Sequence, residues 1–124
     1  MIRSIGLDLV DVERLRRDID KYGERFISRL LGRAERELYA KRSDQARFLA
    51  GRFAAKEAVV KALAPFLNRR PAWSAIEILS DSQGQPYLRL PDNIDASLGG
   101  AKCLLSITHE RQYAAAVAVF EDRT

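Results

Sequence analysis

The stretch SDQARFLAGRFAAKEAVVKAL, residues 43–63, carries the longest helical pattern in the chain. Ser43 or Asp44 suits the N-cap, because a short polar side chain can accept a hydrogen bond from the free backbone amides of a first helical turn. Pro65 cannot continue a helix, so we expect this one to end at about Leu63. The segment predicts one long helix.

One strand and three shorter helices are expected before this segment. Residues 5–9, IGLDL, alternate as in a strand, with Ile5, Leu7 and Leu9 on one face and Asp8 on the other. The expected helices run from about Val12, capped by Asp11, to Lys21, and then over Arg25–Leu31 and Arg33–Arg42, with Tyr22-Gly23 ending the first.

The second half of the chain is mostly strand. Ala75–Leu79 and Pro86–Leu90 flank the turn DSQGQ, in which Gly84 can adopt a positive φ. The last elements are a short helix capped by Asp92 and ending at Gly99-Gly100, and an antiparallel pair formed by Lys102–Thr108 and Tyr113–Phe120. Helices first and strands later predict an α+β fold: a small antiparallel sheet packed with one long and several short helices, in a single domain over residues 1–124.

The composition excludes several classes of protein. With 124 residues, 47% of them hydrophobic and 31% charged, the chain has the size and apolar content of one folded domain rather than of a disordered segment. Its apolar runs fall short of the roughly 20 residues of a membrane span, and its first residues lack the apolar core of a signal peptide. The single cysteine, Cys103, cannot form an intrachain disulfide and suits a buried strand. We therefore expect a soluble, cytoplasmic protein without a membrane partner.

The basic charge is concentrated in the first half of the chain. The net charge is +4, and residues 1–61 hold fifteen basic and ten acidic side chains, against six and seven in residues 62–124. Sixteen of the 21 basic residues are arginine, whose guanidinium suits carboxylates and phosphates. Arg14, Arg17 and Lys21 recur three and four residues apart and so share a helix face. An acidic protein, a nucleic acid or a phosphorylated small molecule would fit such a surface, which otherwise only aids solubility.

Three side chains form a candidate site for a divalent cation. Asp8 interrupts an apolar strand, and Glu57 and Lys61 lie four residues apart on one face of the long helix. Two carboxylates are a typical protein contribution to Mg²⁺, with water and substrate phosphate completing the octahedron. The competing interpretation is structural: Asp8 caps the end of its strand, and Glu57 and Lys61 form an ordinary surface pair.

His109 is the only histidine in the chain, and it follows Ser106-Ile107-Thr108 at the expected end of a strand. It could contact phosphate or carry a proton, or it could be a turn residue that the backbone satisfies. Its position alone leaves both interpretations open.

Four segments follow one another in an order that is typical of a known enzyme family. IGLDLVDVER, residues 5–14, is similar to a Gly-x-Asp strand that leads to an arginine on a first helix. RFAAKEAVVKAL, residues 52–63, resembles Phe-x-x-Lys-Glu-Ala-x-x-Lys, and GQPYL, residues 84–88, resembles a Gly-x-Pro-x-Leu hairpin. SITH, residues 106–109, followed by YAAAV, residues 113–117, resembles a closing Ser-x-Ser-His strand pair. Together they resemble the bacterial holo-acyl-carrier-protein synthases, the small 4′-phosphopantetheinyl transferases.

The resemblance implies a reaction. The family transfers 4′-phosphopantetheine from coenzyme A to a serine of an apo acyl carrier protein, with Mg²⁺ as the metal, and releases adenosine 3′,5′-bisphosphate. By their match to the motifs, Asp8 and Glu57 are the implied metal ligands, and Lys61 is the implied lysine near the coenzyme A pyrophosphate. Glu57 and Lys61 are the implied catalytic residues, and the serine proton passes to Glu57 or to a water on the metal. The product serves fatty acid biosynthesis, a polyketide pathway or both.

The resemblance also implies contacts to coenzyme A that involve two subunits. Arg52, Lys56 and His109 match coenzyme A contacts, with His109 at the 3′-phosphate. The family works as a homotrimer with sites between subunits. His109 is therefore expected to serve a site whose Asp8 and Glu57 belong to a neighbour.

The carrier protein is the second implied partner. Arg14 matches a residue that docks on acidic side chains of the carrier, and Arg17 and Lys21 share its basic face. Acyl carrier proteins are acidic, which agrees with the charge of the first half of the chain.

Two positions depart from the family pattern. The family has a Gly-Thr-Gly stretch after the long helix, whose backbone amides can cradle phosphate, where this chain has APFLNRRP, residues 64–71. Arg69 or Arg70 is a candidate to replace that contact. Thr108 stands for the usual serine before His109 and keeps the hydroxyl group.

Three further hypotheses compete with a transferase. A Mg²⁺-dependent nuclease could use Asp8, Glu57 and Lys61, but a strand rather than a helix would then be expected to carry the second carboxylate and the lysine. The 8% aromatic content also does not favour a nucleic-acid groove, so we expect no nucleic-acid partner. The second hypothesis is a non-catalytic binder of an acidic partner, and the third is an inactive member of the family.

Overall fold

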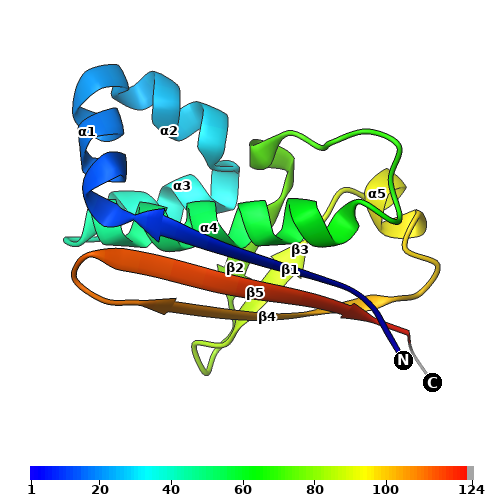
Figure 1. Ribbon diagram of the computed structural model, residues 1–124. Helices are drawn as coiled ribbons and strands as arrows, with labels where there is room; N and C mark the ends of the chain where they lie inside the picture. Colours follow the sequence, from blue (N-terminus) through cyan, green and yellow to red (C-terminus); the bar gives the residue numbers. More distant parts are fainter. Residues whose placement is uncertain (123–124) are drawn as a thin grey trace.

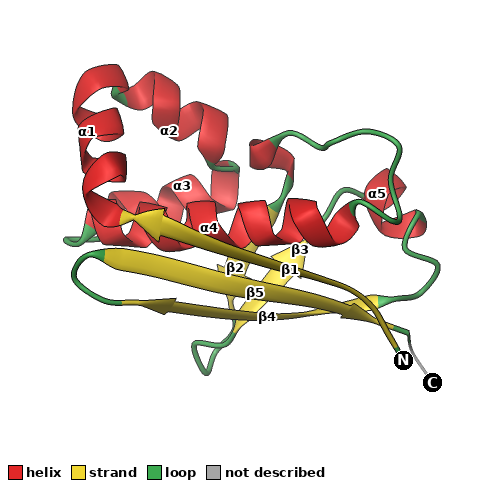
Figure 2. Cartoon of the chain, in the orientation of Figure 1, coloured by secondary structure: helices red, strands yellow, loops and turns green. Residues whose placement is uncertain are grey.

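The computed structural model describes residues 1–122. Within them the elements are β1 (Ile2–Asp11), α1 (Val12–Tyr22), α2 (Glu24–Leu30), α3 (Arg33–Ala40), α4 (Gln45–Leu63), the 3₁₀ turn η1 (Trp73–Ala75), β2 (Glu77–Ser80), β3 (Pro86–Arg89), α5 (Asp92–Ala96), β4 (Lys102–His109) and β5 (Tyr113–Glu121). The predicted α+β fold, a small antiparallel sheet with one long and several short helices, is confirmed (Figure 2). None of the helices in this range is long and apolar enough to cross a membrane.

Helix α4 is the centre of the fold. It lies along one face of an antiparallel sheet with the strand order β1-β5-β4, and α1 and α2 lie on its other side (Figure 1). Strands β2 and β3 form a separate antiparallel hairpin. Most residues of α4 are buried, among them Leu49, Val59 and Leu63. A helix that is apolar on nearly all sides is fixed by the elements packed around it.

The contact between β1 and α4 depends on small residues. A Cβ on Gly6 would lie 1.9 Å from the carbonyl oxygen of Ala58 and 3.0 Å from the amide nitrogen of Ala62, so this approach admits only glycine. The Ser4 hydroxyl donates to the carbonyl of Ala62 at 2.6 Å in the same region. We call this contact between β1 and α4 the seam. Asp8 follows Gly6 by two residues and therefore lies on the same side of the sheet, which places its carboxylate beside α4.

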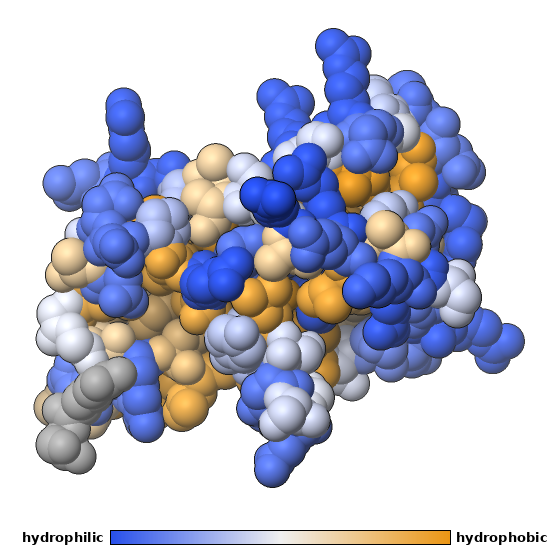
Figure 3. Space-filling view, turned by 180° about the vertical axis from the view of Figure 1, so that it is seen from behind, coloured by the Kyte–Doolittle hydropathy of each residue, from blue (hydrophilic) through white to orange (hydrophobic). Residues whose placement is uncertain are grey.

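The opposite side of the sheet is apolar and uncovered in the single chain. Ile5, Leu7 and Leu9 share this side, as expected from their alternation, and they are 66%, 64% and 65% exposed. Leu104 of β4 extends the surface at 49% exposed, with Val119 of β5 between it and Ile5. We call these five residues the outer sheet face. Seen from behind, most of the molecule is hydrophilic, with apolar side chains gathered in a few places (Figure 3).

Three local features differ from the sequence-based expectation. Asp44 occupies the N-cap position of α4, but its side chain makes no capping hydrogen bond; its carboxylate instead accepts two hydrogen bonds from Arg42, at 2.7 and 2.8 Å. Strand β2 begins at Glu77 rather than at Ala75, because the residues before it form η1. Asp92 lies inside α5 instead of capping it, and α5 ends before the expected glycines. Each difference lies at the end of an element and leaves the fold class unchanged.

Candidate active site

Asp8 and Lys61 meet where β1 crosses α4. The Lys61 Nζ donates to the Asp8 Oδ1 at 3.2 Å and to the backbone carbonyl of Leu7 at 2.9 Å. The Asp8 side chain is 19% exposed and that of Lys61 is 54% exposed, so solvent screens the attraction and the pair contributes little to stability. The pair instead presents a carboxylate and an ammonium group at the surface of the seam.

Glu57 lies one helical turn before Lys61 on α4 and has partners on only one of its oxygens. Its Oε1 accepts from the indole Nε1 of Trp73 at 2.7 Å and from a guanidinium nitrogen of Arg70 at 2.6 Å. Its Oε2 accepts no hydrogen bond from the residues that the structure describes. The carboxylate therefore has one oxygen held by the protein and one oxygen free.

The donor set fits Mg²⁺ rather than a structural metal. Asp8 contacts Lys61 and α4 carries Glu57 one turn before Lys61, while no group of three or more His, Cys, Asp or Glu side chains that could hold a metal occurs in residues 1–122. A structural zinc site has four protein ligands, whereas Mg²⁺ keeps several waters and takes one or two carboxylates together with substrate phosphate. The residues present therefore suit the expected ion.

A hollow of about 210 Å³ lies beside the first half of α4. His109 and Arg52 are among the residues that line it, and we call it the His109 hollow. Arg42, Phe48 and Pro86 are also in its wall. The Arg52 guanidinium lies 4.5 Å from the centre of the Phe48 ring, and its buried Nε has no hydrogen-bond partner among the described residues. Burial lowers the pKa of Arg52. A buried N–H without an acceptor, next to a second arginine and a histidine, favours an anion such as phosphate.

Lys56 lies apart from Asp8 and Lys61 and does not line the His109 hollow, so in the single chain its side chain is not exposed for the expected contact with coenzyme A. Its side chain is fully buried, and its Nζ donates to Glu35 at 2.6 Å, to the carbonyl of Trp73 at 2.8 Å and to the carbonyl of Ile76. An ammonium group has three donors, and all three are used inside the protein. Burial lowers the pKa of Lys56, and the nearby Glu35 carboxylate opposes this shift. Lys56 therefore ties α4 to α3 and to the segment before β2.

Lys56→Ala is expected to lower the free energy of unfolding by roughly 3–5 kcal/mol, because it leaves the Glu35 carboxylate buried without its partner. Urea denaturation followed by circular dichroism measures this change. The double variant Lys56→Met with Glu35→Leu is the matched control, and it should recover part of the loss since no lone charge stays in the core. A Lys56→Ala protein as stable as the wild type would contradict the structural role.

The basic residues predicted on α1 share an exposed face. Arg14, Arg17 and Lys21 are all exposed to solvent. The Arg14 guanidinium lies 5.7 Å from the centre of the Phe53 ring, and its Nε is 4.0 Å from Asp18. These are weak contacts, so the face is available to an acidic partner.

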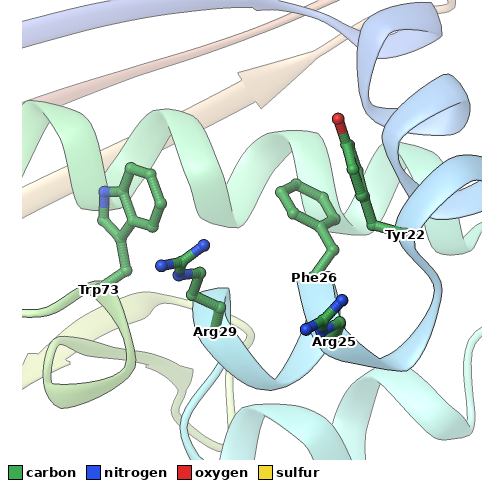
Figure 4. Close-up of a pocket in the computed structure, with 5 residues that line it drawn as sticks. All are labelled: Tyr22, Arg25, Phe26, Arg29 and Trp73. Carbon is green, nitrogen blue, oxygen red and sulfur yellow. The ribbon is translucent and has the colours of Figure 1, made fainter.

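A larger hollow, of about 620 Å³, opens beside α2. It is lined by Tyr22, Arg25, Phe26, Arg29 and Trp73. Figure 4 shows Arg29 and Trp73 on facing sides of the hollow, with Phe26 and Tyr22 next to each other farther along. Tyr22 and Phe26 are close in the sequence, but Trp73 joins them only because η1 lies beside α2, which no periodicity of the chain shows.

Comparison with known proteins assigns the family. A family model for the 4′-phosphopantetheinyl transferase superfamily matches residues 4–118. A holo-[acyl-carrier-protein] synthase from Protochlamydia amoebophila is 41% identical over 97% of this chain and 98% of the relative. The chain belongs to the holo-[acyl-carrier-protein] synthase family. The membership confirms the resemblance seen in the four sequence motifs, and it makes the chain an enzyme of the phosphopantetheinyl transferase type.

Solved structures of holo-[acyl-carrier-protein] synthases share the fold. The crystal structure of the synthase from Neisseria meningitidis matches with a TM-score of 0.90 at 30% identity, over 98% of this chain and 100% of that one. The synthase from Bacillus anthracis, described as a complex with CoA (3′,5′-ADP), matches with a TM-score of 0.81 at 33% identity, over 99% of each chain. The likeness covers both the three-stranded sheet and the helices that carry the candidate site.

Proposed function

We propose that the chain transfers 4′-phosphopantetheine from coenzyme A to a serine of an apo acyl carrier protein, depends on Mg²⁺ and releases adenosine 3′,5′-bisphosphate. The observation that carries the proposal is the seam between β1 and α4, where Asp8 contacts Lys61 and α4 presents Glu57 one turn away. Membership in the holo-[acyl-carrier-protein] synthase family and the coenzyme A complex of the Bacillus anthracis relative support the choice of substrates.

The residues of the seam suit a phosphoryl transfer. The serine oxygen attacks the phosphorus that carries pantetheine, the bond from that phosphorus to the bridging pyrophosphate oxygen breaks, and the bisphosphate leaves with the added negative charge. Asp8 and Glu57 would hold Mg²⁺, which when bound neutralises charge on the pyrophosphate. Lys61 would bring its ammonium group to the same charge. Glu57, directly or through a water, is the proposed acceptor of the serine proton.

Arg52 and His109 are proposed to bind the 3′-phosphate of coenzyme A. The buried Nε of Arg52 supports this role, because a phosphate oxygen would satisfy a donor that has no acceptor among the described residues. Arg42 adds a second guanidinium to the same hollow, although no sequence motif points to it. Arg70 is proposed to serve the pyrophosphate in place of the missing glycine-rich stretch, since it already contacts Glu57.

The enzyme is proposed to be a homotrimer with sites between subunits. Asp8, Glu57 and Lys61 are not among the residues that line the His109 hollow, so the two halves of the site do not share one cavity in the single chain. The outer sheet face is an apolar surface that a neighbouring copy would cover. The proposal includes a cytoplasmic location and a role in fatty acid biosynthesis and lipid metabolism.

The intact mass of an apo acyl carrier protein tests the reaction. After incubation with this enzyme, coenzyme A and Mg²⁺, the carrier should gain the mass of one phosphopantetheine, and EDTA should abolish the gain. No gain with intact coenzyme A binding would implicate the choice of carrier or the altered stretch at residues 64–71. Loss of both transfer and coenzyme A binding would overturn the proposal in favour of a nuclease or a non-catalytic binder.

Arg14→Glu is expected to weaken binding of the carrier protein at least about tenfold, because it turns an attraction on the basic face of α1 into a repulsion. Coenzyme A affinity should stay within about twofold of the wild type, since α1 does not line the His109 hollow. Isothermal titration calorimetry with each ligand measures both. Arg36→Glu, the same charge change on the exposed side of α3, is the control. A larger loss of coenzyme A affinity than of carrier affinity would contradict the docking role.

A further inference from the structure

Trp73 is held to α4 at two points. Its carbonyl oxygen accepts from the buried Nζ of Lys56 at 2.8 Å. Its indole ring packs edge-on against Phe53, with ring centres 5.4 Å apart and an angle of 66° between the planes. Both anchors come from α4, the helix that also carries Glu57. The indole ring is therefore fixed relative to the Glu57 carboxylate.

The indole N–H is the best-fixed donor to Glu57. Its Nε1 lies 2.7 Å from the Glu57 Oε1, a short distance that is typical of a hydrogen bond to a charged acceptor. Arg70 donates to the same oxygen, and its guanidinium lies 5.5 Å from the centre of the indole ring. The Arg70 side chain is 54% exposed, so solvent screens its share of the interaction. Trp73 thus holds the carboxylate where Arg70 only supplements it.

We propose that Trp73 is the positioning residue of Glu57. The indole N–H engages Oε1, which fixes the plane of the carboxylate and leaves Oε2 as the oxygen offered to a ligand. This inference rests on the proposed function, in which that ligand is Mg²⁺. Hydrogen bonds that orient a metal ligand typically change metal affinity or activity roughly 10–100-fold when they are lost.

The fluorescence of Trp73 tests the contact without any substrate. Trp73 is the only tryptophan in the chain, so its emission reports on one ring. In metal-free buffer, Glu57→Ala should change the wavelength or intensity of emission, because the indole N–H loses its acceptor. Asp8→Ala is the matched control: it removes the other proposed metal ligand, which does not contact Trp73, and should leave the emission unchanged. Unchanged emission in Glu57→Ala, or equal changes in both variants, would overturn the proposal.

Trp73→Phe tests the consequence for the metal. Phenylalanine keeps an aromatic ring against Phe53, and it removes the donor that reaches Glu57 together with one ring of the indole. In calorimetric titrations with coenzyme A present, the apparent Mg²⁺ affinity should fall roughly 10–100-fold. Transfer at saturating Mg²⁺ should return to within several-fold of the wild type, since Glu57 itself is intact. Tyr87→Phe, the loss of one polar group from an exposed ring on β3, should leave the Mg²⁺ affinity unchanged.

The outcomes separate this inference from the proposed function. A wild-type enzyme without Mg²⁺-dependent transfer would refute the proposed function, while the emission comparison still reports on the contact between Trp73 and Glu57. A wild-type enzyme with Mg²⁺-dependent transfer and a Trp73→Phe variant of equal Mg²⁺ affinity would refute the positioning role alone. If Trp73→Phe does not fold, the comparison of Glu57→Ala with Asp8→Ala decides the inference.

Discussion

Asp8→Ala and Glu57→Ala are each expected to lower the rate of phosphopantetheine transfer at least about 10³-fold while the protein stays folded. Each removes one of the two carboxylates proposed to hold Mg²⁺, and charge stabilisation by such an ion contributes several kcal/mol to the transition state. Folding should tolerate both changes, because Lys61 and Arg70, the charged partners of the two carboxylates, are each 54% exposed and solvent screens both ion pairs. The rate of mass gain of the apo carrier at saturating coenzyme A measures the effect.

Two controls make this result specific to the seam. Glu37→Ala removes an exposed carboxylate from α3, and it should retain the wild-type rate. Thermal unfolding of each variant should show a melting temperature close to that of the wild type. A near-normal transfer rate in either Asp8→Ala or Glu57→Ala would contradict the assignment of the metal ligands.

Gly6→Ala is expected to destabilise the protein by roughly 3 kcal/mol or more. The added Cβ would lie 1.9 Å from the carbonyl oxygen of Ala58, and neither group is the end of a flexible side chain that can move aside. Strand β1 and helix α4 must then separate, which also moves Asp8 away from Lys61, so transfer should fall together with stability. Urea denaturation and the carrier assay measure the two effects.

Gly51→Ala is the matched control for stability. Gly51 lies inside α4, and a Cβ there would lie 3.4 Å from the Cγ2 methyl of Ile107 and 3.9 Å from the His109 ring, which are ordinary van der Waals distances. Alanine is also favoured over glycine in a helix interior by about 1 kcal/mol, so this variant should be as stable as the wild type or more stable. Equal stability of Gly6→Ala and Gly51→Ala would show that β1 and α4 are not held together by the glycine seam.

The sequence predicts the elements of the fold well where local signals mark their ends. The long helix ends at Leu63 as expected, because Pro65 stops it, and β4 and β5 extend only one residue past their expected ends. The alternation of β1 correctly groups Ile5, Leu7 and Leu9, but alternation does not say which side of a strand is covered. The side that packs on α4 is decided by a close approach at Gly6, which depends on residues more than fifty positions away.

The candidate site is predictable in part for the same reason. The spacing of Glu57 and Lys61 on one helix is a local property, whereas the contact of Lys61 with Asp8 joins residues 53 positions apart and is seen only in the structure. Lys56 follows the motif pattern equally well, yet it points into the core because Glu35, 21 residues earlier, is buried beside it. The contact of Trp73 with Glu57 spans 16 residues and an irregular segment, so no periodicity shows it.

The outer sheet face makes the single chain prone to aggregation. A folded single chain keeps Ile5, Leu7 and Leu9 in water on β1, which is an edge strand of its sheet with unpaired backbone groups. An apolar edge strand is a template for pairing with the wrong chain. If a trimer covers this face, the interval between synthesis and assembly is when the chain is most open to aggregation, and that interval lengthens as fewer copies are made. At low expression, more of the chains would then aggregate before they assemble into a trimer.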